Sequence, residues 1–240
     1  MFKSIKDESK LYTWQLFDRI SARYDLLNRV LSIGIDRYWR KKISTFLQPK
    51  KRLQVLDLAT GTGDVMFSLV KQKPDQFESL IGIDLSEKMM DVGREKSKKY
   101  NLNSLITFKR GDAEDIPLET ESVDLVTMAF GIRNVSDVSK TLEEIYRVIK
   151  AEGQIIILEF SLPTSPLVKQ IYLYYFRNIL PRIGGVLSGD YHAYHYLNQS
   201  VESFPYGKQF ADLLENSNFK KIKMQPLNFG IATLYIGYKL

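Results

Sequence analysis

The sequence predicts an α/β fold in which a mainly parallel sheet is covered by helices on both faces. Between residues 53 and 160, short apolar segments alternate with longer segments of helical periodicity. The short segments are apolar at nearly every position, which is typical of parallel strands buried on both sides. The chain has 240 residues, 44% of them hydrophobic and 26% charged, so it can form the large core that such a fold requires.

The elements follow from local patterns. Apolar residues recur at helical spacing over residues 13–47, Gly34 interrupts the run and Pro49 ends it, which predicts two or three helices. Strands are expected at residues 53–58, 79–85, 106–110, 123–130 and 154–160. Helices are expected between them at residues 64–73, 86–100 and 136–150, with Ser86 as an N-cap. A helix at 207–216 and a hairpin of strands 219–227 and 230–238 close the chain, because Asn228-Phe229-Gly230 is a turn signal.

An aromatic-rich stretch interrupts the alternation of strands and helices. Residues 172–206 hold 9 aromatic side chains in 35 residues, about twice the chain average of 12%. Pro181, Gly184, Gly185 and Gly189 lie in the same stretch. We therefore expect an insertion, at about residues 163–206, that lies over the carboxyl edge of the sheet. The expected organisation is an N-terminal helical cap at 1–50 and a main domain at 51–240.

Composition excludes several classes of site. The chain has no Cys and only two His, so disulfides, Cys-ligated metals, thiol nucleophiles and three-His metal centres are excluded, and no metal is expected. No apolar run is long enough to span a membrane, and residues 1–10 do not resemble a signal peptide, so we expect a cytoplasmic protein. The net charge of +6 is uneven: residues 1–52 hold 13 Lys/Arg and 5 Asp/Glu, which gives +8, and the remainder gives −2.

The basic N-terminal block has several interpretations. It could be a solvated helical face, or it could meet an anionic membrane surface or an anionic ligand. Nucleic acid is not expected as a partner, because the chain shows no nucleic-acid-binding motif.

A glycine-rich turn follows the first predicted strand. Asp57, Gly61, Gly63 and Asp64 lie in this turn, where glycine lets a ligand approach the backbone at the start of the next helix. A dinucleotide fingerprint would need a third glycine where Met66 stands. The two carboxylates would also repel a pyrophosphate. They suit an adenosine that carries an ammonium and a sulfonium, which is S-adenosylmethionine.

Two further acidic residues follow the next strands. Asp84 ends the second strand, 21 residues after Gly63, and could accept both ribose hydroxyls. Asp112 follows the third strand and could accept the adenine amino group, while the N–H of Ala113 meets a ring nitrogen. The alternatives are an N-cap for Asp84 and a turn cap for Asp112. Because ligands bind at the carboxyl ends of parallel strands, we favour the cofactor roles.

Five further stretches form a distinctive combination. They are Phe17-Asp18-Arg19-Ile20-Ser21 with Tyr24-Asp25-Leu26-Leu27-Asn28, Leu31-Ser32 and Trp39; Phe130-Gly131-Ile132-Arg133-Asn134-Val135; Arg147-Val148-Ile149-Lys150 with Leu158-Glu159-Phe160-Ser161; Leu180-Pro181-Arg182-Ile183-Gly184; and Gly237-Tyr238. In this combination the chain resembles the menaquinone/ubiquinone C-methyltransferases, a family of class I S-adenosylmethionine-dependent methyltransferases, over about residues 17–238.

The chain departs from the family pattern at several positions. They are Leu27, Asp36, Met66, Ala129 and the pair Ala151-Glu152. Met66 and Ala129 replace hydroxyl residues that could touch the cofactor.

The resemblance implies a fold, a substrate and a reaction. The fold would be a class I methyltransferase (Rossmann-like) seven-stranded mixed sheet. The substrate would be a prenylated quinol, most simply demethylmenaquinol, methylated on a ring carbon. Such a carbon is a good nucleophile only when the neighbouring phenol loses its proton, so the reduced quinol can react and the oxidised quinone cannot. A transient contact of the basic N-terminal helices with the inner face of the membrane would then bring the enzyme to its substrate.

The residue that accepts the proton is less well determined. Arg133 and Asn134 follow the fourth strand, near the expected position of the methyl group, where Arg133 could stabilise a quinolate or orient a water. Asp190, His192 and His195 lie in the aromatic insertion and could accept a proton or bind a hydroxyl, although a structural role is the alternative. The insertion's aromatic side chains would form the walls of a pocket for a flat ring and its tail.

Alternatives remain open at this stage. They are a ubiquinone-precursor quinol, a small phenol or sterol as methyl acceptor, a cofactor-binding assembly subunit without activity, and an NAD oxidoreductase. The sequence does not determine the oligomeric state, and a homodimer is left open.

Overall fold

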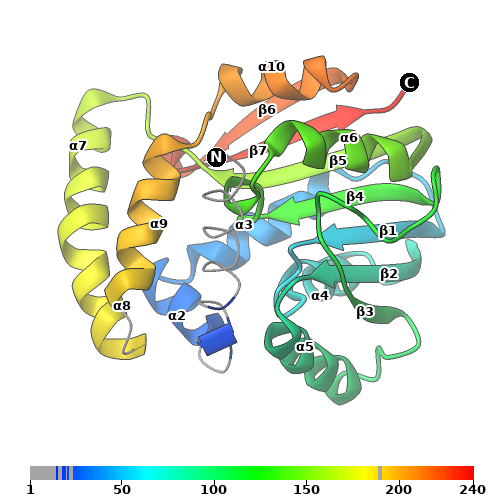
Figure 1. Ribbon diagram of the computed structural model, residues 1–240, viewed down its shortest axis with the longest axis horizontal. Helices are drawn as coiled ribbons and strands as arrows, with labels where there is room; N and C mark the ends of the chain where they lie inside the picture. The colour runs from blue at the N-terminus through cyan, green and yellow to red at the C-terminus, as the bar shows by residue number, and fades with distance from the viewer. Residues whose placement is uncertain (1–14, 16–17, 20, 22–23, 189–190) are drawn as a thin grey trace, which may run out of the picture.

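The computed structural model describes residues 15, 18–19, 21, 24–188 and 191–240, and its centre is a seven-stranded sheet (Figure 1). The strand order is β3-β2-β1-β4-β5-β7-β6. The first five strands are parallel, and β7 runs antiparallel to both β5 and β6, which confirms the predicted mixed sheet and hairpin. The strands are β1 Leu53–Leu58, β2 Phe77–Asp84, β3 Ile106–Arg110, β4 Val123–Ala129, β5 Ile149–Phe160, β6 Lys220–Leu227 and β7 Ala232–Tyr238.

Helices cover both faces of the sheet because successive strand side chains point to opposite sides. On β5, Ile155 and Ile157 join a core formed with helices α6 and α10, whereas Ile156 and Leu158 join a core formed with α3 and α4. The helices are α2 Tyr24–Leu31, α3 Ile35–Ile43, α4 Asp64–Gln72, α5 Glu87–Lys99, α6 Val138–Val148, α7 Pro166–Tyr174, α8 Leu180–Ser188, α9 Tyr191–Ser203 and α10 Lys208–Asn216.

Most predicted elements differ from the structure by one to three residues, and the largest difference lies around α6. The helix predicted at 136–150 begins after Asp137, whose carboxylate accepts a hydrogen bond from the N–H of Lys140 at 3.1 Å. It ends at Val148, and β5 begins at once at Ile149 rather than at 154. Ile149 pairs with Val123 at the start of β4, so residues 149–153 belong to the sheet rather than to a helix or a loop. The N-cap predicted at Ser86 is confirmed, since its Oγ accepts from the N–H of Met89 at 3.3 Å.

Helix α2 and the helices of the insertion lie beyond the carboxyl ends of the strands, whereas α3 packs against one face of the sheet (Figure 1). In Figure 1, the arrowheads of β1, β2 and β4 point toward the side on which α2, α7, α8 and α9 stand. A π-helical turn, η4 (Tyr175–Ile179), joins α7 to α8, whose second residue, Pro181, has no N–H to donate. The Tyr175 hydroxyl donates to the carbonyl of Leu31 at 2.9 Å and so joins the insertion to α2. The domain boundaries at 50 and 51 stay predictions.

Among the described helices, none is long and apolar enough to cross a membrane.

Candidate functional site

A first cavity, the strand-end cavity, lies at the carboxyl ends of four neighbouring strands. Its wall includes Gly61 in the loop after β1, Asp84 at the end of β2, Asp112 and Ala113 after β3, and Ala129 at the end of β4. The sheet order places β1 between β2 and β4, so the strand order reverses at β1. In open α/β sheets the crevice at this reversal is the usual ligand site. The structure therefore brings together five of the nine predicted cofactor residues.

Asp84 holds the glycine-rich loop in place. One carboxylate oxygen accepts the N–H of Gly61 and the other accepts the N–H of Ser86, both at 2.8 Å. Gly61 and Gly63 have φ of 55° and 79°, in the left-handed region that glycine adopts without strain. Burial raises the pKa of Asp84, and the backbone N–H groups that donate to it oppose this rise. Asp84 thus links the loop to the end of β2 and still borders the cavity.

The other four predicted cofactor residues are not among the residues that line this cavity, and their cofactor roles stay predictions. Asp57 is buried in β1 and accepts hydrogen bonds from the hydroxyls of Thr60 and Thr127 at 2.6 and 2.7 Å. Asp64 pairs with Lys96 at 2.7 Å. Met66 is fully buried in the core between α4 and the sheet, because it lies on the inner face of that helix. Gly63 is also not among the residues that line this cavity.

These displaced carboxylates have different electrostatic environments. Burial raises the pKa of Asp57 to about 6, although Thr127, Thr60 and Arg40 act in the opposite direction. Burial also opposes ionisation of Asp64, but the charges of Arg40 and Lys96 outweigh it and lower its pKa. The negative character of the cavity wall therefore comes from Asp84 and Asp112 rather than from Asp57 and Asp64.

Two non-glycine residues at the cavity have left-handed backbone conformations. Ala59 follows β1 with φ 48°, and Phe130 follows β4 with φ 58°. Such conformations cost about 1–3 kcal/mol each and are concentrated at functional sites. The turn at Phe130 directs its carbonyl to Arg133, whose Nη1 donates to it at 2.6 Å.

A second cavity, the apolar cavity, has a volume of about 370 Å³ and lies between the cap and the insertion. Its walls come from α2, α3, the ends of β4 and β5, α7, η4, α8 and α9. They are mainly aliphatic and aromatic and include Trp39, Phe160, Tyr172 and Phe176. This confirms that aromatic side chains of the insertion line a pocket.

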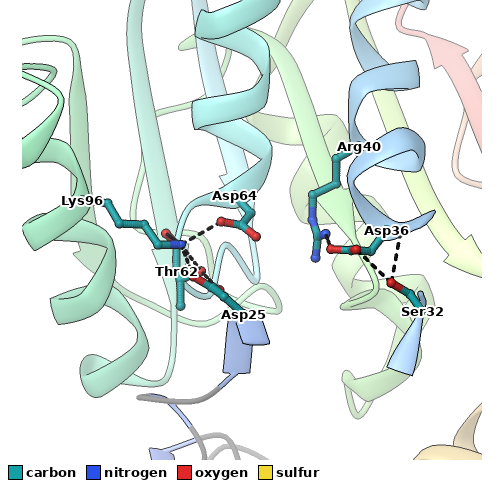
Figure 2. Close-up of polar contacts among 7 residues, drawn as sticks. All are labelled: Asp25, Ser32, Asp36, Arg40, Thr62, Asp64 and Lys96. Carbon is teal, nitrogen blue, oxygen red and sulfur yellow. Dashed lines mark hydrogen bonds and ion pairs between the residues drawn. The ribbon is translucent and has the colours of Figure 1, made fainter. Parts of the chain in front are cut away.

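Two ion pairs border the apolar cavity. Arg133 pairs with Glu159 at 2.8 Å, with side-chain exposures of 6% and 0%, and its guanidinium lies 5.3 Å from the Phe160 ring centroid. Figure 2 shows the other pair, in which Arg40 binds Asp36 at 2.5 Å and Ser32 donates to the same carboxylate at 2.8 Å. Burial raises the pKa of Glu159, and the charge of Arg133 opposes this. Each guanidinium is thus held by a carboxylate at the edge of an apolar space.

The two cavities meet at Tyr24 and Phe130, which line both. The consecutive residues Arg133 and Asn134 divide between them, with Arg133 on the apolar cavity and Asn134 on the strand-end cavity. Burial raises the pKa of the Tyr24 hydroxyl, while a hydrogen bond with Asn28 and the charges of Arg40 and Arg133 lower it. Sequence reasoning assigned no role to Tyr24. Its place in the 24–28 motif could have marked Tyr24 as a functional residue, but the sequence does not show that two cavities meet at this side chain.

The predicted residues of the insertion cannot be placed in the site. Asp190 lies outside the described residues. His192 and His195 lie in α9, but the structure describes nothing of their side chains. Their proposed roles as proton acceptors or hydroxyl ligands stay predictions. Among the described residues, no group of three acidic or His side chains could hold a metal ion.

The strand-end cavity fits an adenosyl group that carries no phosphate. Asp84 and Asp112 supply carboxylates where hydroxyl and amino groups could bind, and Ile83, Met89 and Met128 supply apolar contacts for a flat base. Among its described wall residues there is no Lys or Arg to neutralise a phosphate. A side chain at Gly61 would come within 3.2 Å of the Met89 methyl group, so glycine keeps this wall open.

Comparisons with known proteins agree with this geometry. A model of the ubiE/COQ5 methyltransferase family matches residues 3–239. The chain is 43% identical to a demethylmenaquinone methyltransferase from Bacteroides fragilis over 94% of this chain and 91% of that protein. It is 41% identical to the ubiquinone/menaquinone biosynthesis C-methyltransferase UbiE of Geotalea uraniireducens over all of both chains.

Solved structures share the fold at low sequence identity. An S-adenosylmethionine-dependent methyltransferase from Thermotoga maritima superposes with a TM-score of 0.66 at 19% identity and covers 95% of this chain and 100% of its own. Another from Aquifex aeolicus gives 0.60 at 19% identity, with coverage of 84% and 89%.

Proposed function

The chain belongs to the ubiE/COQ5 methyltransferase family, and we propose that it methylates a ring carbon of demethylmenaquinol to give menaquinol. It is an S-adenosylmethionine-dependent methyltransferase. The chain has similar sequence identity, 43% and 41%, to a relative named as a demethylmenaquinone methyltransferase and to one named as a ubiquinone/menaquinone C-methyltransferase. Sequence identity therefore does not choose between a naphthoquinol and a benzoquinol substrate, and the proposed naphthoquinol needs a direct test.

One observation carries the proposal: an apolar cavity of about 370 Å³ adjoins the strand-end cavity through Tyr24 and Phe130. Such a cavity suits a flat ring with an isoprenoid tail, and its few polar groups would orient the ring. Asp84, Asp112 and the backbone around Gly61 and Ala113 would hold the cofactor, which supplies an electrophilic methyl group when bound. A nucleophile in the apolar cavity would then face the cofactor across the shared wall.

The residues of this chain would orient the quinol and stabilise its anion. The ring carbon becomes nucleophilic when the adjacent phenol loses its proton, and it would then take the methyl group that the bound cofactor supplies. The ring carbon exchanges its own hydrogen for the methyl group, so one net proton leaves the quinol; Asp190, His192 and His195 stay the predicted acceptors of that proton, with solvent as the final acceptor. The guanidinium of Arg133 can stabilise the resulting phenolate, and Glu159 fixes its position at 2.8 Å. The surrounding aromatic side chains exclude water, which strengthens this electrostatic interaction. Holding both reactants in line can contribute about 7–11 kcal/mol.

The test is methyl transfer from labelled S-adenosylmethionine to chemically reduced demethylmenaquinone. We expect turnover with the reduced naphthoquinone, none with the oxidised form, and a much lower kcat/KM with a reduced ubiquinone precursor. Equal or higher kcat/KM for the benzoquinol would assign the chain to ubiquinone synthesis instead. Cofactor binding by calorimetry without turnover on any quinol would contradict an enzymatic role.

We further propose that the enzyme contacts an anionic membrane surface through the mouth of the apolar cavity. Ile33 and Ile171 line the cavity and are also 82% and 63% exposed. Leu167 and Tyr174 lie on the same helix as Ile171 and are 67% and 65% exposed. The elements that form the cavity also carry exposed basic side chains, namely Arg37 and Lys41 on α3 and Arg182 on α8. A prenylated substrate could pass from the bilayer into the cavity at this rim.

Vesicle sedimentation tests the membrane contact. We expect Ile33→Glu to weaken binding to phosphatidylglycerol-containing vesicles at least about tenfold, because burial of one Ile side chain contributes about 1.5–3 kcal/mol. Tyr100→Glu is the matched control, since Tyr100 is 58% exposed at the end of α5 and far from the rim in sequence. Binding unaffected by Ile33→Glu, or by salt, would refute the contact.

A further inference from the structure

Lys96 joins three elements around the glycine-rich loop. It lies on α5, and its ammonium nitrogen is 2.5 Å from Asp25, 2.7 Å from Asp64 and 2.9 Å from the hydroxyl of Thr62 (Figure 2). An ammonium has three N–H donors, and these three acceptors can use all of them. The Thr62 hydroxyl in turn donates to the second oxygen of Asp25 at 2.7 Å.

The three acceptors lie in three different elements: the cap helix α2, the glycine-rich loop and the helix α4 that follows the loop. Asp25 lies in the first turn of α2, Asp64 begins α4, and Thr62 lies between the two glycines whose backbone is left-handed. The side chains of Lys96, Asp25 and Asp64 are only 21–29% exposed, so solvent screens this cluster less than an open surface pair. The cap is also tied to the start of α5, because the N-cap residue Ser86 donates a hydrogen bond to Asp18.

The position of α2 determines the walls of both cavities. Tyr24 lines both, and Leu27, Asn28 and Leu31 line the apolar cavity. The described residues that line these cavities do not include Lys96. Any effect of Lys96 on quinol binding is therefore indirect, and among the partners of Lys96 it is Asp25 that lies on the helix lining the apolar cavity.

We propose that Lys96 is a positioning residue that couples cofactor binding to completion of the quinol cavity. The inference rests on the proposed function for the identity of the quinol, but not for the coupling itself. A ligand against Gly61 restrains the loop that carries Thr62, and this loop conformation favours the hydrogen bonds that dock Asp25 and α2. Because coupling between two sites is reciprocal, docking of α2 also strengthens cofactor binding.

Hydrogen–deuterium exchange tests the coupling without any quinol. S-adenosylhomocysteine, the cofactor product, is added to the wild-type protein, and exchange is followed at the amides of residues 24–31. We expect protection of about fivefold or more, the lower end of ordinary site–site coupling. Lys96→Met should abolish this protection, and Lys96→Arg should retain part of it, because a guanidinium can still pair with both carboxylates.

Lys98→Met is the matched control. Lys98 is on the same helix and pairs with Glu95, but both side chains are mostly exposed, at 67% and 73%. This variant should keep the wild-type protection. Full protection in Lys96→Met, or none in wild-type protein that demonstrably binds S-adenosylhomocysteine, would overturn the proposal.

Kinetics give a second readout that a purely structural role would not produce. In Lys96→Met, the KM for reduced demethylmenaquinone should rise by at least about tenfold, with a smaller change in kcat, because substrate binding is what the misplaced α2 impairs. A lower kcat at constant KM, with less folded protein, would indicate stability alone and overturn the coupling. If the wild-type enzyme turns over no quinol, the proposed function fails, and the exchange experiment still decides the role of Lys96.

Discussion

The buried carboxyl group of Asp57 should give the protein a pH-dependent stability that one substitution removes. Asp57 is 1% exposed, and its two oxygens accept hydrogen bonds from Thr127 and Thr60. Burial raises its pKa from 3.8 to about 6, which means that the folded protein binds this proton more tightly than the unfolded chain does. Asp57→Asn replaces the carboxyl with a neutral group of the same shape.

The magnitude follows from the two pKa values. Their difference is about 2 units, since about 6 minus 3.8 is about 2, and it corresponds to about 3 kcal/mol at 1.36 kcal/mol per unit. The folded pKa is raised, so this contribution to stability is fully present below pH 3.8 and is lost as the pH rises through about 6. Roughly half of it, about 1.5 kcal/mol, is lost between about pH 5 and about pH 8.

Urea denaturation of wild type and Asp57→Asn at several pH values between about 5 and about 8 measures this effect. The free energy of unfolding of the variant, relative to wild type, should increase by about 1.5 kcal/mol over that range. Other carboxylates titrate in both proteins and cancel in the difference. Asp91→Asn serves as a control, because Asp91 is 65% exposed on α5. A difference between Asp57→Asn and wild type that stays constant with pH would refute the reasoning.

Two further predictions concern the buried groups at the cavities. Glu159→Gln leaves the Arg133 charge buried without its partner, which should cost about 3–5 kcal/mol and lower Tm by roughly 10 °C in thermal unfolding. Glu202→Gln, which breaks the solvent-screened pair with Arg177, should lower Tm far less, and an equal fall of Tm in both variants would contradict the prediction. Asp84→Asn places an amide donor against the N–H of Gly61 or Ser86, so the Kd for S-adenosylhomocysteine should rise at least about tenfold in calorimetry. An unchanged Kd would mean that Asp84 does not shape the cofactor site.

The sequence by itself determined the sheet and the edge at which ligands bind. Short, continuous apolar segments that alternate with longer amphipathic segments are typical of buried parallel strands, and parallel strands bring their carboxyl ends to one edge. Asp84, Asp112 and Gly61 could therefore be assigned to one cavity from their places after strands alone. The N-cap at Ser86 and the hairpin turn at Asn228–Gly230 were also predictable, because both depend on adjacent residues.

Only the tertiary structure decided where the side chains of the glycine-rich turn point and what the cap contributes. Asp57 is buried against the hydroxyl of Thr127, which lies on the neighbouring strand β4. Thr127 is 70 residues away in sequence, so a local pattern could not identify it as the partner. Asp64 binds Lys96, which α5 brings beside it. Tyr24 and Lys96 acquire their roles only when α2 docks on the loop after β1. Local patterns fix the path of the backbone, but a side chain's partner is set by segments distant in sequence that folding brings together.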